Sequence, residues 1–188
     1  MDNRARLLDA ALQLFAARGY DAVGVQEIVE SAGLTKPSLY HHFGSKHGLL
    51  TELVDRRGEM LLNIVARAAT YEGDLPLTLN RVVQAYFAAA NRDPAFQRFR
   101  LALWLAPSES EAGQAVAAQF QREADLIEAL FEAASRDHGN MRGRAGLLAP
   151  SFLAMVHAHV ARFLRGQGRL DAELAFRALH QFMHGIYS

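Results

Sequence analysis

A short segment of the chain gathers hydrogen-bond donors and basic groups on what the spacing predicts to be one face of a helix. Leu39 and Phe43 are four residues apart and therefore share an inward face, which leaves the polar side chains around them outward. No acidic residue occurs between Ser31 and Thr51. Donors presented together without carboxylates suit hydrogen bonds to phosphates and base edges. The residues predicted to face a DNA groove are Thr35, Lys36, Pro37, Ser38, Tyr40 and His41.

Two short helices and a sharp turn are needed to position these donors. The first helix has an apolar stripe between residues 25 and 29, and Gly33 stands where a helix must end in a left-handed residue. Thr35 can cap the second helix, with Pro37 in its first turn, where a missing N–H does no harm. This arrangement predicts a helix-turn-helix, which lays its second helix in the major groove of DNA.

The motifs around this unit are more specific than a generic helix-turn-helix. An amphipathic helix is followed by Gly19-Tyr20, Ile28, Ala32-Gly33-Leu34, Leu39-Tyr40-His41-His42-Phe43 and Ser45-Lys46. Over residues 4–50 the chain thereby resembles the TetR/AcrR family of transcriptional regulators. The resemblance implies phosphate contacts by Tyr40 and Lys46, and release of the DNA by a small effector. The chain departs from the family at Val23 and Gly24, where the family usually has Thr or Ser, because Gly24 offers no hydroxyl to a phosphate.

The amino-acid composition restricts which other classes of protein the chain could belong to. The 20 basic and 20 acidic residues give a net charge of zero, so DNA binding depends on the local patch rather than on the whole chain. The absence of cysteine excludes disulfides and thiolate metal sites. The start of the chain lacks a signal-peptide core, and no uninterrupted apolar run approaches the roughly 18–20 residues that cross a bilayer. We therefore expect a soluble cytoplasmic protein that does not bind membranes.

Helical periodicity continues to the end of the chain and predicts an all-α fold of about nine helices. Residues 1–47 are predicted to form the helix-turn-helix domain, with three helices. Residues 48–188 are predicted to form a helical domain for effector binding and dimerisation.

The last two predicted helices, over about 147–165 and 171–188, are apolar on more than one face. Such helices are either central core or packed against a second subunit. We favour a homodimer, because helix-turn-helix proteins of this type use two-fold symmetric half-sites. The residues predicted for the interface are Phe163, Leu164, Leu179, Phe182 and Ile186.

Aromatic residues concentrate in the middle of the chain and are consistent with an effector pocket or with ordinary core. Small-molecule pockets are mostly apolar, with a few polar groups that fix orientation. The residues predicted to line the pocket are Phe87, Phe99, Leu103, Trp104, Phe120 and Met155, with His159 as a polar contact.

Sequence signals for catalysis or metal binding are absent. No Glu-x-x-His pair, phosphate-binding glycine loop or Gly-x-Ser-x-Gly motif occurs. His180 and His184 have chelating spacing but no acidic or cysteine partner, so we expect packing roles. We predict no cofactor, no metal and no catalytic residue. The favoured function is a repressor released from a palindromic operator by a small hydrophobic effector. An effector-free dimer, whose second domain is a scaffold, is the alternative, and a helical-bundle enzyme is the least favoured.

Overall fold

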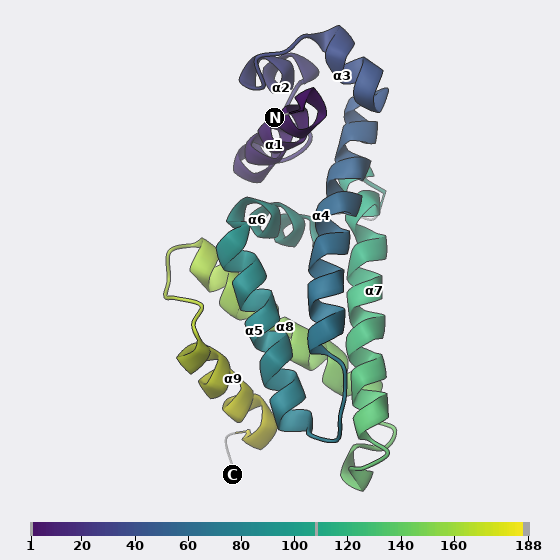
Figure 1. The fold of residues 1–188 in the computed structure, drawn as a ribbon, viewed down its shortest axis with the longest axis vertical. Coiled ribbons are helices and arrows are strands. Elements are labelled where there is room, and N and C mark those ends of the chain that lie inside the picture. The colour runs from purple at the N-terminus through teal and green to yellow at the C-terminus, as the bar shows by residue number, and fades with distance from the viewer. Residues whose placement is uncertain (1, 108, 186–188) are drawn as a thin grey trace. The chain divides into compact units, whose positions relative to one another are not determined.

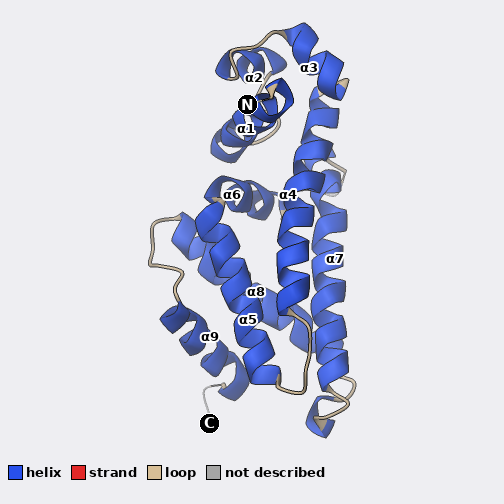
Figure 2. Cartoon of the chain, in the orientation of Figure 1, coloured by secondary structure: helices blue, strands red, loops and turns tan. Residues whose placement is uncertain are grey.

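The computed structural model describes residues 2–107 and 109–185, and within them the fold is entirely helical, as predicted (Figures 1 and 2). The α-helices of the described residues are α1 Asn3–Arg18, α2 Val25–Ser31, α3 Lys36–Phe43, α4 Lys46–Ala68, α5 Leu75–Arg92, α6 Pro94–Leu103, α7 Glu111–Ala134, α8 Ala145–Leu164 and α9 Ala172–His184. A single turn of 3₁₀ helix, Gly139–Met141, lies between α7 and α8.

The chain divides into two compact units, one of Met1–Glu59 and Ala95–Gln119, the other of Met60–Pro94 and Phe120–Ser188. The limits of the units fall inside α4 and α7 and after the first residue of α6, so α4 and α7 contribute several turns to each unit. The boundaries of these compact units therefore differ from those of the predicted domains 1–47 and 48–188. That functional division stays a prediction.

The first unit is built on the apolar face of α1. Leu7, Leu8, Ala11, Leu12 and Phe15 are buried there, and α1 packs against α2 and α3. The Phe15 ring stacks on Phe99 of α6 at 5.7 Å between centroids and meets Tyr20 edge-on at 5.2 Å. Helix α6 thus adds to the core under the helix-turn-helix, which local periodicity did not reveal.

In the second unit, α5 packs against α8 and α9. Phe131, Phe152 and Phe182 form an aromatic cluster with centroid distances of 5.5–6.3 Å. Helix α8 begins two residues earlier than predicted, which places Pro150 in the second turn rather than the first. One backbone hydrogen bond is lost there because proline has no N–H, and the helix nevertheless continues to Leu164.

Helix α8 is also long and apolar enough to cross a membrane by length and composition, with a mean hydropathy of 1.4 over its best window. His157, His159 and Arg162 lie within this helix. Its mean hydropathy is therefore high although it contains no continuous apolar run of that length. The core helix of a soluble protein meets the same criterion, so this is weak evidence for a membrane.

Candidate nucleic-acid interface and effector region

The turn between α2 and α3 is fixed by its own hydrogen bonds and by α1. Leu34 N–H donates to Val29 O at 2.8 Å and Gly33 N–H donates to Glu30 O at 3.0 Å, which is the Schellman arrangement of a helix end. Gly33 has φ +62°, and a Cβ there would lie 2.9 Å from Arg6 Nη2. The same Arg6 nitrogen donates to Ala32 O at 2.6 Å. The positive φ therefore favours glycine at this turn, and a Cβ would also displace the end of the Arg6 side chain.

Helix α3 presents the predicted donor face to solvent. Leu39 is fully buried, which fixes the rotation of the helix, and half of the Tyr40 side chain is exposed (50%). Thr35, Lys36, Pro37 and His41 are exposed as well, whereas Ser38 is half-buried. Most of the predicted residues of α3 and its cap are thus accessible, and their contacts with DNA stay a prediction.

Lys46, at the start of α4, is held in place by the loop that joins α1 to α2. Its ammonium donates to Tyr20 O and Val23 O, each at 3.1 Å, and lies 4.0 Å from the centroid of the Tyr20 ring. Two of its three N–H donors are therefore used within the protein. The structure adds this bracing role to the phosphate contact that the resemblance implied, and that contact stays a prediction.

The first residue before α2, Gly24, has no side-chain hydroxyl, and the carboxylate of Glu27 caps the helix end instead. Gly24 N–H donates to Glu27 Oε1 at 3.0 Å, and Glu27 also pairs with Arg18 at the end of α1. The Gly24 N–H, followed by Arg18, holds the pKa of the Glu27 carboxyl below its usual value. A Glu three residues after a helix cap is the signal that could have identified this role from the sequence.

Tyr20 joins the helix-turn-helix to the start of α7. Its side chain is buried, and its hydroxyl donates to Glu111 Oε2 at 2.7 Å. Burial raises the pKa of the Tyr20 phenol, and the hydrogen bond to Glu111 raises it further. The phenol therefore stays protonated and acts as a donor at neutral pH.

The predicted effector residues fall on both compact units. Phe99, Leu103 and Trp104 belong to the first unit, and Phe87, Phe120, Met155 and His159 belong to the second. Phe99 is a core residue beneath the helix-turn-helix, and the Trp104 side chain, just beyond α6, is 49% exposed. Within the second unit, Phe87 meets His159 edge-on at 6.4 Å and Phe120 meets His157 at 6.1 Å. Their joint role in an effector pocket stays a prediction.

A buried polar cluster in the second unit was missed by the sequence analysis. The Tyr86 hydroxyl donates to Glu123 Oε2 at 3.2 Å, and His157 Nε2 lies 3.6 Å from the same oxygen. Glu123 is fully buried and His157 nearly so. Glu123 lies between Phe120 and Ile127 on the same apolar side of α7. A charged residue in that position was the sequence signal that could have predicted a buried polar cluster.

The predicted interface residues differ in exposure. Phe163 and Leu164 are half-buried, Leu179 is buried, and Phe182 belongs to the aromatic cluster described above. Ile186 lies outside the described residues. The exposed large apolar side chains of α9 are Phe176 (66%) and Met183 (40%), which the prediction did not include.

The histidine pair of α9 lies on the surface. His180 and His184 are exposed, with ring centroids 4.4 Å apart. The described residues contain no group of three or more His, Cys, Asp or Glu side chains that could hold a metal ion.

An N-terminal helix-turn-helix with an accessible donor face, followed by a larger helical region, defines a DNA-binding transcriptional regulator. Residues 7–53 match the family described as bacterial regulatory proteins, tetR family. The transcriptional activator FasR of Mycolicibacterium smegmatis is 31% identical over 185 residues, 98% of this chain and 82% of FasR. The chain belongs to the TetR family of bacterial transcriptional regulators, and it is a regulator rather than an enzyme.

Other relatives are similar over less of the chain or at lower identity. The repressor KstR2 of Rhodococcus jostii is 47% identical over 51 residues, 27% of this chain and 25% of KstR2. The structure of PfmR from Thermus thermophilus has a TM-score of 0.78 at 24% identity, covering 100% of this chain and 99% of PfmR. FadR of Bacillus subtilis, solved in complex with stearoyl-CoA, has a TM-score of 0.81 at 18% identity, covering 97% of this chain and 99% of FadR. At these identities the two structures establish the fold alone.

Proposed function

We propose that this protein binds a palindromic operator as a homodimer and is released from it by a small, largely apolar effector of the fatty-acyl class. The observation that carries the first half is the exposed donor face of α3, held by the buried Leu39 and by the glycine turn. Two copies related by a two-fold axis would present two such faces to half-sites about 34–36 Å apart.

The effector half of the proposal draws on the second unit and on the relatives. Phe87 is buried and meets His159 edge-on at 6.4 Å, so an aromatic ring and a polar group lie side by side in this unit. Burial lowers the pKa of His159, and the charge of Arg162 lowers it further, so this imidazole is neutral at pH 7 and able to hydrogen-bond. FadR was solved with an acyl-CoA bound, which supports the same class of effector for this chain.

Whether the bound protein represses or activates depends on where the operator lies relative to the promoter. FasR is an activator and KstR2 is a repressor, although KstR2 matches only the DNA-binding quarter of this chain. The repressor role and the cytoplasmic location stay predictions. A promoter–reporter assay with and without the gene for this protein decides between repression and activation.

The test of operator binding begins with selection of duplexes from a random library. We expect an approximately palindromic consensus. Lys36→Ala should flatten the preference among related operators by about 1–3 kcal/mol at one position, because Lys36 opens α3 and can donate to guanine O6 and N7. Arg136→Ala, a change of an exposed cation in the other unit, is the matched control. Equal binding of all duplexes would contradict the proposal.

The test of the effector measures operator affinity in the presence of fatty acids and acyl-CoA thioesters of increasing chain length. Weaker operator binding with one range of chain lengths supports the proposal. Unchanged affinity throughout would leave the effector-free dimer as the better description.

A further inference from the structure

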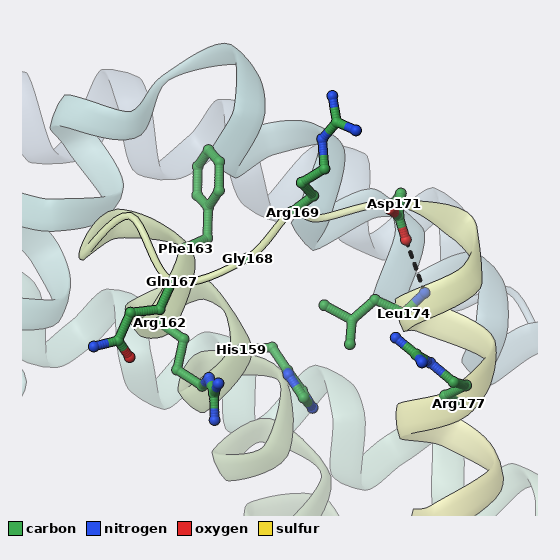
Figure 3. A pocket seen from close by; sticks show the side chains of 9 residues that line it. All are labelled: His159, Arg162, Phe163, Gln167, Gly168, Arg169, Asp171, Leu174 and Arg177. Atoms are coloured by element: carbon green, nitrogen blue, oxygen red, sulfur yellow. Dashed lines mark hydrogen bonds between the residues drawn. The ribbon is translucent and has the colours of Figure 1, made fainter.

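A basic pocket lies where the end of α8 meets the start of α9, within the second unit. Its volume is about 540 Å³, which is in the range of small-molecule sites. Arg162 and His159 reach it from α8, and Arg177 reaches it from α9 (Figure 3). Arg169 lines it from the connecting loop, and Phe163 and Leu174 add apolar surface. We call this site the arginine pocket.

The arginine pocket has more positive than negative charge. Its single lining carboxylate, Asp171, already accepts the Leu174 N–H at 2.9 Å as the cap of α9. Arg177 lies 3.7 Å from Glu173 on the same helix. Arg162 and Arg169 have no ion pair within the described part of the chain. Arg162 and Arg177 extend toward the same side as His159, whereas the Arg169 side chain is turned the other way (Figure 3). Two guanidinium groups, with a third arginine at the rim, therefore favour a ligand with more than one negative charge.

The chemistry of arginine narrows the class of ligand. Guanidinium groups bind phosphate oxygens through paired N–H donors, and one carboxylate would occupy only one of the two that extend toward His159. His159 supplies a neutral hydrogen-bonding group, because burial and Arg162 lower its pKa. The volume exceeds what a lone phosphate ion needs, so the remainder of the ligand must fill the space beside Phe163 and Leu174.

We propose that the arginine pocket binds the phosphate groups of a nucleotide-like small molecule. Two sources share this chemistry. One is a free nucleotide, and the other is the nucleotide part of an acyl-CoA effector, a link that rests on the proposed function. The pocket itself does not depend on that function, so the two ideas can fail separately.

The experiment measures binding of ADP, coenzyme A, palmitoyl-CoA and palmitate to the full chain by calorimetry at 0.1 M salt. We expect ADP and coenzyme A to bind with micromolar Kd, and the double change Arg162→Gln with Arg177→Gln to raise both Kd values at least tenfold. Arg165→Gln is the matched control, because Arg165 is exposed beside the pocket but does not line it. Circular dichroism and sedimentation verify folding and oligomeric state for every variant, since Phe163 is also a predicted interface residue.

Each result has a distinct meaning. Binding of palmitoyl-CoA without binding of coenzyme A or ADP would overturn the arginine pocket and leave the proposed function intact. Binding of coenzyme A and ADP, with no effect of palmitoyl-CoA on operator affinity, would support the pocket as a free-nucleotide site and contradict the acyl effector. If the double variant changes dimer dissociation but leaves every ligand Kd unchanged, the pocket serves a second copy of the chain and the proposal is wrong.

Discussion

Lys46 shows how one side chain of the candidate interface can have two roles that different measurements separate. Its ammonium is shared by two backbone carbonyls and the Tyr20 ring. Charge-assisted hydrogen bonds of this kind stabilise a fold, and a cation–π contact adds to them. A phosphate contact would instead be visible in the salt dependence of DNA binding.

Lys46→Ala should therefore lower the free energy of unfolding by about 1–3 kcal/mol, because the contacts to Tyr20 and Val23 are lost. If Lys46 also contacts a phosphate, binding to all duplexes should weaken alike, and the slope of log affinity against log salt should fall by about 1. Chemical denaturation measures the first effect and salt titration the second. Unchanged stability would contradict the bracing role, and an unchanged slope would contradict the phosphate contact.

We expect the stability of the helix-turn-helix to depend on pH through Glu27. Its pKa in the folded chain lies below the ordinary value of 4.5 because the carboxylate accepts from Gly24 N–H and pairs with Arg18. Unfolding therefore takes up protons near and below that value, and the stabilisation present at neutral pH is lost as the pH falls through the folded pKa. Glu27→Gln should flatten this part of the stability–pH curve. Thermal unfolding between about pH 3 and 7 measures it, with Glu30→Gln, at an exposed position of the same helix, as control.

At the scale of helices, α4 contains a glycine in its interior, where glycine weakens a helix by roughly 1 kcal/mol relative to alanine. Gly58 is buried against α7, and a Cβ there would lie 2.7 Å from Cδ of Gln119. Gln119 is itself buried, and its amide has no hydrogen-bond partner within the described residues. Close packing of the two helices, rather than flexibility, thus accounts for Gly58.

Gly58→Ala should destabilise the protein, because the collision with Gln119 outweighs the roughly 1 kcal/mol that Ala gains in a helix interior. In a Gln119→Ala background the same change should become neutral or stabilising, since the colliding atoms are gone. A double-mutant cycle by urea denaturation measures the coupling. Additive effects of the two changes would refute this explanation.

Helix α9 has exposed apolar side chains that can be changed to test dimerisation without disturbing the core. Phe182 is a poor site for this test, because its ring packs on Phe152 at 5.5 Å and a charge there would disturb the core. Phe176 and Met183 are exposed instead. Changing both to Glu should give a folded monomer with weak operator binding. Sedimentation velocity measures the mass, and Leu105→Glu, at an exposed position in the other unit, is the control. A variant that remains dimeric would place the interface elsewhere.

Periodicity and turn chemistry were sufficient to predict the helices and the solvent-exposed side of α3, because both depend on neighbours within a few residues. The remaining features depend on contacts between distant segments. The contact of Phe99 in α6 with Phe15 in α1 is one of them, and the pocket role of Phe99 stays a prediction. The roles of Tyr20 and Lys46 required knowing that the α1–α2 loop lies beside the starts of α4 and α7. Glu123 and its partners meet only when α5, α7 and α8 come together.

For the whole molecule, the question is how an effector could alter DNA binding. Helices α4 and α7 each contribute to both compact units, and the start of each is bonded to the α1–α2 loop, through Lys46 and Glu111 respectively. Both bonds meet at Tyr20. A shift of α4 or α7 on effector binding would therefore act on Tyr20, while the ion pairs Arg4–Glu52 and Arg57–Asp9 also join α4 to α1.

Tyr20→Phe removes the hydrogen bond to Glu111 while keeping the buried ring and its contact with Lys46. Coupling between effector and operator is reciprocal, so an effector that weakens operator binding roughly 5–150-fold is itself bound that much more weakly by the DNA complex. We expect Tyr20→Phe to reduce this factor while the effector Kd of the free protein stays the same. Calorimetry measures effector binding, and fluorescence anisotropy of a labelled operator measures DNA binding. Tyr71→Phe, which removes a similar hydrogen bond to Asp137 in the second unit, is the matched control and should leave the factor unchanged. An undiminished factor in Tyr20→Phe would exclude the Tyr20–Glu111 contact from the path between the two sites.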